Sequence, residues 1–361
     1  MLFNLLTSLI DQYSFLNVFK YLTFRTGLSV VTSLIVVFLI GGPLIKLFSE
    51  KMITGPIRQD GPIDHIIKKS GTPTMGGVII IIGILSSTLL WADLNNIYVW
   101  TLIFVSLSLG MLGLLDDILK IKFENSRGLK SRYKFLGQII IGIITLFILI
   151  KYSDHEHLFN LYFPFFKNVI WQMGLFFIPF GLFVIIGASN AVNLTDGLDG
   201  LATVPVMLVA LSFTLISYVV GNTIFSDYLQ IQYIPDVGEL SIFCGSVVGA
   251  CLGFLWYNAP PAKIFMGDTG SLSLGGSLAA IAIIVKHEIV LAIIGGLFVL
   301  ETVSVIIQVV SFKLTGKRIF KMAPIHHHFE KKGWAESTIV IRFWIIAIIL
   351  ALVGLATLKL R

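Results

Sequence analysis

Two stretches of this chain place carboxylates directly beside long apolar segments, where charge is costly. Asp116 and Asp117 follow the apolar run 97–115, and residues 193–200 read Asn-Leu-Thr-Asp-Gly-Leu-Asp-Gly between two further apolar runs. A carboxylate at the edge of hydrocarbon is a candidate for a substrate or ion site rather than for a stabilising role. The sequence therefore predicts chemistry at a membrane boundary.

The doubled aspartate allows two interpretations. Neighbouring residues on a helix point about 100° apart, so we expect both carboxylates to face one small ion only if the helix has ended before them. Otherwise one would bind while the other acts as a base. The alternative is an ordinary surface ion pair at a helix end, because Lys120 lies four residues after Asp116.

The stretch 193–200 could form a wall of a nucleotide site. Asn193, Asp196 and Asp199 are spaced by three, which would make a polar stripe on a helix, and Gly197 and Gly200 remove side chains beside it. Amide and carboxylate oxygens there could accept hydrogen bonds from a ribose or a nucleobase. A Gly- and Asp-rich turn between two helices is an equally open alternative.

A third aspartate, Asp268, stands in Gly-Asp-Thr-Gly-Ser at 267–271, directly before an apolar run. Asp268 or Thr269 could simply cap the following helix. However, the free N–H groups of a helix start attract phosphate, and an aspartate there could hold Mg²⁺ together with phosphate oxygens. Upstream, Asn258 and Phe265 supply an amide and a ring for a base, although aromatic residues are also usual at membrane interfaces.

Three consecutive histidines, His326, His327 and His328, lie in a basic segment. Neighbours in sequence rarely converge on one ion, and no Cys or fourth His lies at ligand spacing, so zinc is disfavoured. We expect imidazoles that face a pyrophosphate or hold a carboxylate in place. The Gly-rich stretch 68–77 lacks the spacing of a P-loop and is a weak phosphate signal by itself.

Composition indicates which elements must position these residues. The 361-residue chain is 56% hydrophobic and 13% charged, with a mean hydropathy of +0.92, which leaves too few charges to cover a soluble globule. Both cysteines lie in one apolar run, so no disulfide framework is expected. We predict an all-α polytopic membrane protein in a single domain, 1–361, with ten apolar runs of spanning length at about 27–48, 74–92, 97–115, 135–151, 170–190, 201–220, 240–257, 269–285, 288–311 and 338–358.

The distribution of charge predicts the orientation of these spans. Residues 1–25 have the pattern of a short interfacial helix rather than a span or a secretory signal. Segments 46–69, 116–134 and 313–342 carry five, six and seven basic residues, so the positive-inside rule makes them cytoplasmic and both termini periplasmic. The chemically suggestive stretches then all fall within cytoplasmic loops, at about 49–73, 116–134, 191–200, 258–268 and 312–337.

The motifs together resemble those of one enzyme family over nearly the whole chain. They are 71–77 (Gly-Thr-Pro-Thr-Met-Gly-Gly), Asp116-Asp117, 190–200 (Asn-Ala-Val-Asn-Leu-Thr-Asp-Gly-Leu-Asp-Gly), 265–271 (Phe-Met-Gly-Asp-Thr-Gly-Ser) and 323–330 (Ala-Pro-Ile-His-His-His-Phe-Glu). The chain resembles the phospho-N-acetylmuramoyl-pentapeptide transferases of the polyprenyl-phosphate N-acetylhexosamine-1-phosphate transferase superfamily. The aspartates resemble the whole superfamily, whereas the His-His-His-x-Glu form resembles the muramoyl branch.

The resemblance implies a ten-helix, Mg²⁺-dependent enzyme of the bacterial inner membrane, with its active site on the cytoplasmic face. It would transfer phospho-MurNAc-pentapeptide from UDP-MurNAc-pentapeptide to undecaprenyl phosphate in the lipid bilayer, giving lipid I and UMP. No nucleic acid is expected as a partner, and a homodimer stays open. Direct attack and a covalent aspartate intermediate also stay open.

The resemblance also implies roles for individual residues. Asp268 matches the Mg²⁺ ligand, Asp116 the base that deprotonates the lipid phosphate, Asp117 an assisting group and His327 a further catalytic group. The positions implied for the nucleoside site are Asn193, Asp196, Asp199, Asn258 and Phe265. The groups implied near the pyrophosphate or the rim of the site are Lys69, Lys120, Lys134 (preferred over Lys130), His327 and His328. Further implied substrate contacts are Gln308 and His326.

Two other functions remain open on the sequence alone. A sister transferase that uses UDP-GlcNAc would share the aspartates. A secondary transporter would also have many spans with polar residues and Gly or Pro breaks, but transporters place such groups near the middle of the membrane.

Overall fold

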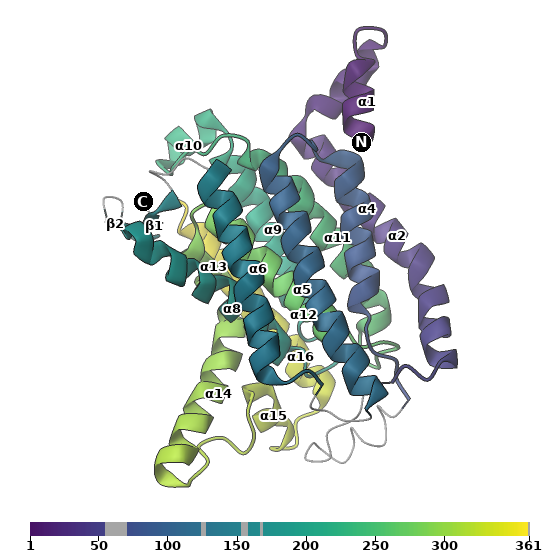
Figure 1. Cartoon of the computed structure of the whole chain (residues 1–361), viewed down its shortest axis with the longest axis vertical. Helices are drawn as coiled ribbons and strands as arrows, with labels where there is room; N and C mark the ends of the chain where they lie inside the picture. The colour runs from purple at the N-terminus through teal and green to yellow at the C-terminus, as the bar shows by residue number, and fades with distance from the viewer. Residues whose placement is uncertain (55–70, 124–127, 153–157, 167–168, 360–361) are drawn as a thin grey trace.

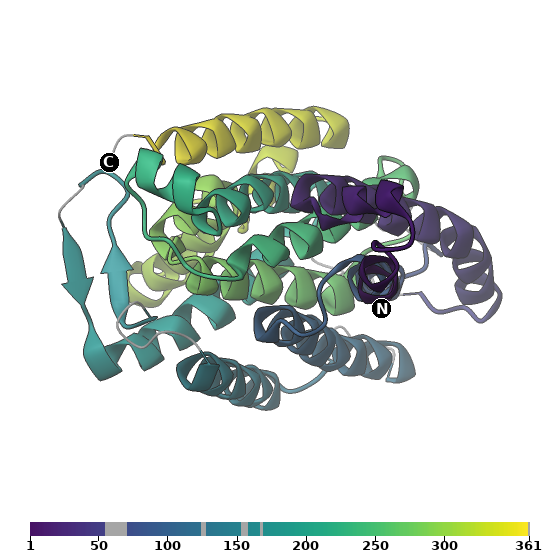
Figure 2. The ribbon, with the colours of Figure 1, turned by 90° about the horizontal axis from the view of Figure 1, so that it is seen from above.

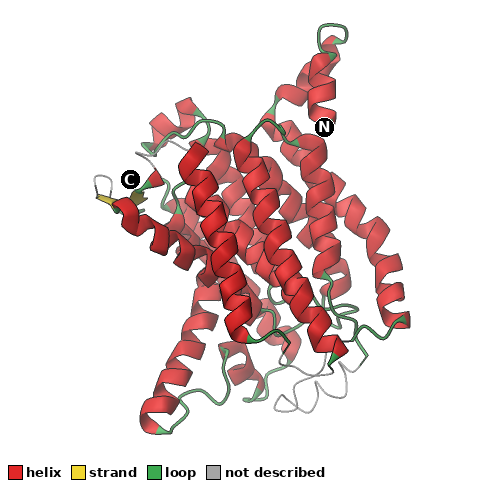
Figure 3. Cartoon of the chain, viewed as in Figure 1, coloured by secondary structure: helices red, strands yellow, loops and turns green. Residues whose placement is uncertain are grey.

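The computed structural model describes residues 1–54, 71–123, 128–152, 158–166 and 169–359, and these are overwhelmingly helical (Figures 1 and 3). Nine segments of the described residues are long and apolar enough to cross a membrane. The helices that form them are α2 (Leu22–Glu50), α5 (Ile97–Lys122), α6 (Ser131–Tyr152), α8 (Phe177–Thr195), α9 (Thr203–Val220), α11 (Leu240–Asn258), α12 (Gly267–Ile284), α14 (Gly296–Thr315) and α16 (Glu336–Ala356). The predicted all-α, multi-span membrane architecture is confirmed.

Shorter elements complete the bundle. The second predicted span is α4 (Gly77–Trp91), which at 15 residues is shorter than the others. The remaining helices and 3-10 helices are α1 (Leu2–Ser8), η1 (Ser14–Lys20), η2 (Gly174–Phe176), α10 (Thr223–Leu229), η3 (Val237–Glu239), α13 (Glu288–Ile294) and α15 (Ile325–Glu330). The predicted N-terminal helical segment is thus α1 and η1, which project from the end of the bundle opposite α15 (Figure 1).

Two predicted spans have wrong boundaries. The run 288–311 is not one helix, because α13 and α14 meet at Gly295-Gly296, and a glycine pair weakens a helix at that point. The run 170–190 begins as a strand, since β2 (Ile170–Gln172) pairs antiparallel with β1 (Asn160–Tyr162) and the helix starts only at Phe177. Apolar residues alone did not distinguish this short hairpin from the start of a span.

Two helices also extend into regions predicted as loops. The third span continues from residue 115 to Lys122, and α8 continues to Thr195. The predicted loops 116–134 and 191–200 are therefore partly helical. As a result Asp116, Asp117 and Asn193 stand on regular helices, which fix the directions of their side chains.

Helix α12 is the centre of the bundle, and every residue from Thr269 to Ile284 is buried. It packs on α5 and α8, while α9 and α11 pack on each other. Glycines allow the close approach, because a Cβ at Gly275 would collide with the backbone of Ala188 and one at Gly276 with Leu109. Seen from above, α16 lies along one edge of the bundle and α5 and α6 along the opposite edge (Figure 2).

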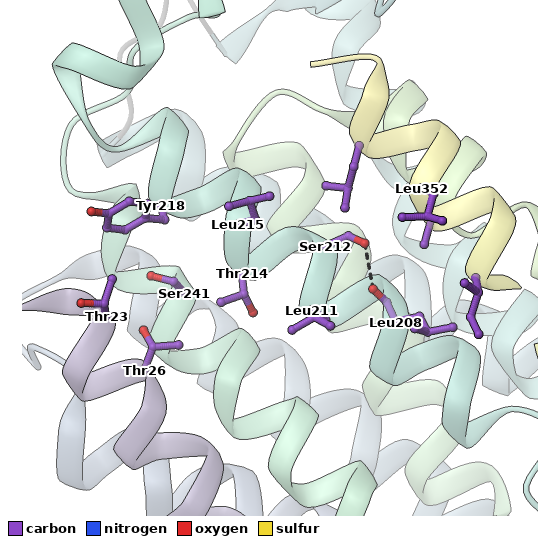
Figure 4. A pocket seen from close by; sticks show the side chains of 13 residues that line it. Thr23, Thr26, Leu208, Leu211, Ser212, Thr214, Leu215, Tyr218, Ser241 and Leu352 are labelled. Atoms are coloured by element: carbon purple, nitrogen blue, oxygen red, sulfur yellow. Dashed lines mark hydrogen bonds between the residues drawn. The ribbon is translucent and has the colours of Figure 1, made fainter. Parts of the chain in front are cut away.

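A groove with a volume of about 560 Å³ lies between α2, α9, α11 and α16 (Figure 4). Three of its hydroxyl groups are satisfied within their own helix. Thr26, Ser212 and Thr214 each donate a hydrogen bond to the carbonyl oxygen four residues earlier, at 2.8 to 2.9 Å. The groove therefore presents an essentially apolar surface, and none of its lining residues belongs to the polar stretches of the predicted site.

Candidate active site

Three aspartates from two helices form one carboxylate cluster. Asp116 and Asp117 near the end of α5 and Asp268 in the first turn of α12 each offer an oxygen, and these oxygens lie within 4.8 Å of one another. Helix α5 does not end before the doubled aspartate but continues to Lys122, so the two side chains point in different directions. The start of α12 crosses α5 so closely that a Cβ on Gly113 would collide with the Asp268 backbone. Asp268 therefore reaches both diverging carboxylates.

Asp117 caps α12 from another helix. Its Oδ1 accepts a hydrogen bond from the Asp268 amide at 3.2 Å, and its Oδ2 accepts from the Thr269 amide at 3.0 Å and from Thr269 Oγ1 at 2.8 Å. The alternative in which Asp268 or Thr269 caps α12 is wrong, because the N-cap residue is Met266 and no side chain of its own caps it. The turn needs Gly267, whose φ of +73° favours glycine. Asp268 is consequently left to face the cluster.

Two lysines neutralise part of the cluster's charge. Lys120 Nζ lies 2.7 Å from Asp116 Oδ2 and 3.0 Å from Asp268 Oδ2. Lys134 Nζ contacts Asp268 Oδ2 and lies 3.6 Å from Asp116 Oδ2. The Asp116–Lys120 pair therefore exists, but Asp116 is only 2% exposed and shares the lysine, so this is not an ordinary surface pair. Lys134 rather than the exposed Lys130 joins the cluster.

The cluster has the donor chemistry of a site for a hard divalent cation. Carboxylate oxygens are the ligands that such ions prefer, and a Mg²⁺ ion usually keeps several waters or phosphate oxygens beside one or two carboxylates. Three carboxylates against two ammonium groups leave an excess of negative charge. A metal ion could thus be held by Asp116, Asp117 and Asp268.

The stretch 193–200 splits into two parts with different contacts. Asn193 Nδ2 donates to Asp268 Oδ1 at 2.9 Å and to Ser271 Oγ at 2.8 Å, so it orients the carboxylate of Asp268. Asp199 lies beyond the end of α8 and is 6% exposed. Its Oδ2 accepts from the Ala262 amide at 2.9 Å, so Asp199 holds the segment before α12 in place.

Asp196 sits between these two parts. Its burial, and then the carboxylates of Asp268 and Asp117, raise the pKa of Asp196 to about 7, although a hydrogen bond from the Gly267 amide acts in the opposite direction. Asp196 therefore lies close enough to the cluster for its negative charge to raise the pKa of Asp196.

Asn258 and Gln308 are fully engaged with protein atoms. The Asn258 amide is 2% exposed, accepts from the Gly200 amide at 3.1 Å and from Thr203 Oγ1 at 2.9 Å, and donates to the Ile264 carbonyl. Gln308 donates to the Phe320 carbonyl at 2.8 Å and accepts from the Ile319 and Phe320 amides. In the structure each side chain holds a turn. Phe265 is half-buried, and its backbone bonds to Gly76 and Pro73, which joins 71–77 to the site.

The three histidines of α15 turn to three different partners. His326 is fully buried with its Nδ1 3.1 Å from Glu301 Oε2, and His327 Nδ1 lies 2.6 Å from Glu330 Oε2. His328 Nδ1 accepts from the Lys321 amide at 3.0 Å, which requires an unprotonated nitrogen. Partial burial and the ammonium groups of Lys332 and Lys321 lower the pKa of His328, in agreement with that role. Lys69 lies outside the described residues.

Comparison with known proteins decides the family. The family model for Glycosyl transferase family 4 matches residues 99–286, and the phospho-N-acetylmuramoyl-pentapeptide-transferase signature 1 matches residues 69–81. The chain is 69% identical to the phospho-N-acetylmuramoyl-pentapeptide-transferase of Pelagibacter ubique (strain HTCC1062) and 53% identical to that of Maricaulis maris (strain MCS10), over the full length of both chains in each case. The chain belongs to this transferase family. The family predicted from the motifs is confirmed.

The matched regions of the transferase contain the carboxylate cluster, its two lysines and the segment that hydrogen-bonds to the backbone just before Asp268. Residues 99–286 contain Asp116, Asp117 and Asp268 with both lysines, and 69–81 contains the segment that bonds to Phe265 and Met266. The histidine helix α15 and Gln308 lie beyond residue 286, and α15 contacts the turn 196–200 where His326 packs against Gly197.

Sequence reasoning missed two glutamates of the transferase that contact predicted site residues. Glu336 Oε1 accepts from the Asp199 amide at 2.9 Å, and Glu301 pairs with His326. Glu301 could have been found, because it is a carboxylate inside an apolar run and such a residue is a candidate for function by default. Glu336 carries no such signal, since it starts a helix, where acidic residues are common.

Proposed function

We propose that this transferase moves phospho-MurNAc-pentapeptide from UDP-MurNAc-pentapeptide to undecaprenyl phosphate, forming lipid I and UMP. The cluster of Asp116, Asp117 and Asp268 with two lysines carries the proposal, because its carboxylates can hold a divalent cation that, together with the two ammonium groups, suits a pyrophosphate and a membrane-anchored phosphate. The full-length identity to relatives with that activity in their names supports this substrate pair over UDP-GlcNAc.

Phosphoryl transfer requires mainly positioning and neutralisation of charge. Mg²⁺ held by Asp268 would supply a positive charge to the pyrophosphate. Lys120 and Lys134 lie 3.0 Å or less from Asp268 Oδ2 and add further positive charge. Asn193 donates a hydrogen bond to the Asp268 carboxylate, and Asp117 accepts one from the Asp268 backbone amide, so both hold Asp268 in place.

Asp116 is placed to act as the base. Its Oδ1 accepts from the Leu129 amide and its Oδ2 pairs with Lys120, so both contacts favour the ionised carboxylate. Asp116 takes the proton of the lipid phosphate, whose oxygen forms a bond to the phosphorus that carries the sugar. The bond from that phosphorus to the UMP oxygen breaks, and UMP leaves with the electron pair.

The turn 196–200 supplies the nucleoside side of the proposed site, with Asp196 nearest to the cluster. We place this site on the cytoplasmic face of the bacterial inner membrane and both termini in the periplasm, since the basic segments 46–69, 116–134 and 313–342 lie on the cluster's side of the predicted topology. Asp268 lies in the first turn of α12, and Asp116 and Asp117 lie within the last two turns of α5, which favours surface chemistry over transport.

The test is an assay of the purified protein with undecaprenyl phosphate, Mg²⁺ and each of two sugar nucleotides. We expect UMP and lipid I from UDP-MurNAc-pentapeptide and no turnover of UDP-GlcNAc. Turnover of UDP-GlcNAc alone would show that the substrate assignment is wrong. Loss of activity with chelator and recovery with Mg²⁺ would support the metal assignment, and full activity in chelator would contradict it.

A further inference from the structure

A buried pair of ionisable side chains, Glu301 and His326, lies outside the carboxylate cluster. Glu301 is in α14, His326 is in α15, and both side chains are 0% exposed, with Glu301 Oε2 3.1 Å from His326 Nδ1. Among the described residues, no polar atom has full hydrogen-bond geometry to either side chain, so this close ion-pair contact is the polar contact that the two share. A buried carboxylate in a membrane helix is costly, and removing its single partner would leave it uncompensated. The two residues therefore depend on each other.

The far side of the His326 ring supports the turn at Gly197. A Cβ on Gly197 would collide with His326 Nε2 and would lie 2.9 Å from Cε1, so the imidazole presses directly against the turn's backbone. Gly197 follows Asp196, the residue of this turn that lies nearest the cluster. The ring thus contacts the turn where a glycine is needed to admit it.

The other end of the same turn is held by hydrogen bonds. The Asp199 amide donates to Glu336, the Gly200 amide donates to Asn258, and the Gly200 carbonyl accepts from Trp344 Nε1 at 3.2 Å. The Asp196 carboxylate accepts a hydrogen bond from the Gly267 amide, while the backbone at Gly197 is packed against the His326 ring. The orientation of that ring therefore limits where Gly197 can lie.

We propose that Glu301 is a positioning residue, which fixes the His326 ring against Gly197 and so sets the nucleotide-binding turn 196–200. The Glu301 carboxylate 3.1 Å from Nδ1 favours a proton on that nitrogen, and Nε2 faces the turn. This inference rests on the proposed function, because it assigns the turn to the nucleotide. Since Glu301 touches neither the cluster nor the lysines in the structure, its effect falls on nucleotide binding rather than on the acceptor lipid.

Kinetics of two Glu301 variants test the inference. Glu301→Ala removes the partner of His326, and we expect the KM for UDP-MurNAc-pentapeptide to rise on the order of tenfold, as for loss of other groups that orient a histidine. The KM for undecaprenyl phosphate should stay unchanged. Glu301→Gln keeps a carbonyl oxygen that can accept from Nδ1, so it should partly rescue the KM. If Glu301→Ala does not fold, an unchanged nucleotide KM in Glu301→Gln overturns the inference.

Glu288→Gln is the matched control for the loss of a buried charge. Glu288 is a second buried glutamate and lies 2.7 Å from Lys286, beyond the opposite end of α12. Its substitution should lower the thermal stability in detergent without changing the nucleotide KM. An equal rise of that KM in the control would mean that general loosening, rather than positioning, explains the effect of Glu301.

A double-mutant cycle tests the ring contact itself. Gly197→Ala places a methyl group against His326, so the variant should bind UMP weakly by calorimetry. In a His326→Ala background the methyl group has room, and the further loss from Gly197→Ala should be several-fold smaller. Equal losses of UMP affinity in both backgrounds would show that the contact between His326 and Gly197 does not influence nucleotide binding.

Calorimetry with UMP also separates this inference from the proposed function. If the wild-type protein makes no lipid I, the proposed function fails. If the wild-type protein binds UMP and makes lipid I, and Glu301→Ala has the same UMP affinity and the same turnover, only the positioning role fails.

Discussion

The two ends of α12 each carry buried ionisable groups, but they differ in balance and in access. At its start, Asp268 meets two further carboxylates and two lysines, and the side chains of Asp268, Lys120 and Lys134 are 14%, 23% and 17% exposed. Just beyond its end, Lys286 meets Glu288 at 2.7 Å, and the two side chains are 2% and 1% exposed. The carboxylate cluster at the start of α12 has an excess of negative charge and is partly exposed, and we call it the open cluster. The pair of Lys286 and Glu288 has equal and opposite charges and is buried, and we call it the sealed pair.

The sealed group has the contacts of a structural pair. Lys286 Nζ also donates to the Leu158 carbonyl at 2.9 Å and lies 3.9 Å from the centre of the Phe177 ring. Burial lowers the pKa of Lys286, and Glu288 opposes that shift. Every partner of the ammonium group is thus protein. Burial alone therefore does not mark a catalytic group, whereas unbalanced charge at a partly exposed site does.

The largest expected effect comes from removing the open cluster's central carboxylate. Asp268→Ala should lower the turnover of lipid I at least about 10²-fold, because the charge that orients both lysines and the metal ion is lost. The melting temperature in detergent should change little, since the cluster already holds excess negative charge. Retention of full turnover would show that the open end of α12 is not the active site.

The sealed end should respond in the opposite way. Glu288→Ala leaves Lys286 buried without its carboxylate, and breaking such a pair typically costs about 3–5 kcal/mol in the free energy of unfolding. We expect a large fall in melting temperature, with the turnover per folded molecule retained. A variant of normal stability with lost turnover would abolish the distinction between the two ends.

The membership of the open cluster was easier to predict than its detailed contacts. Membrane spans follow from apolar length, and the parity of those spans alone places Asp116, Asn193 and Asp268 on one face of the membrane. Their contacts could not follow in the same way. The reach of Asp268 between Asp116 and Asp117 depends on the crossing of two helices at Gly113, which no local pattern specifies.

Side-chain partners were hardest to predict. Asn258 was expected to face a base, yet in the structure its amide is engaged by Gly200, Thr203 and Ile264, because a buried amide must satisfy its hydrogen bonds wherever the fold supplies them. Likewise, the break of the ninth span at Gly295-Gly296 depends on packing as well as propensity.

Two basic residues at the start of α6, of which only Lys134 joins the open cluster, should differ in their effect on turnover. Lys134→Ala removes a cation in contact with Asp268 and should reduce turnover about tenfold to a hundredfold. Lys130→Ala, four residues earlier and exposed, should leave turnover unchanged. Steady-state assays on both purified variants provide the measurement. Equal losses would mean that the segment's overall charge, and not the contact with Asp268, is what matters.

The smallest expected effect is a change in the pH dependence of stability through Asp196. Its pKa is about 7 in the folded protein against a usual value of 3.8, so between these values the folded state binds more protons than the unfolded state. The free energy of unfolding contributed by this group must then fall as the pH rises from about 4 to about 7, and stay level above. Asp196→Asn cannot titrate and should lack this decline.

Melting curves of the wild-type protein and Asp196→Asn at pH 5, 6, 7 and 8 measure this contribution. The variant should gain stability relative to the wild type up to about pH 7, with no further gain at pH 8. A constant difference across the series would mean that burial and the carboxylates of Asp268 and Asp117 do not raise the pKa of Asp196. Since the sealed pair at the other end of α12 is present in both proteins, the difference reports on the open end alone.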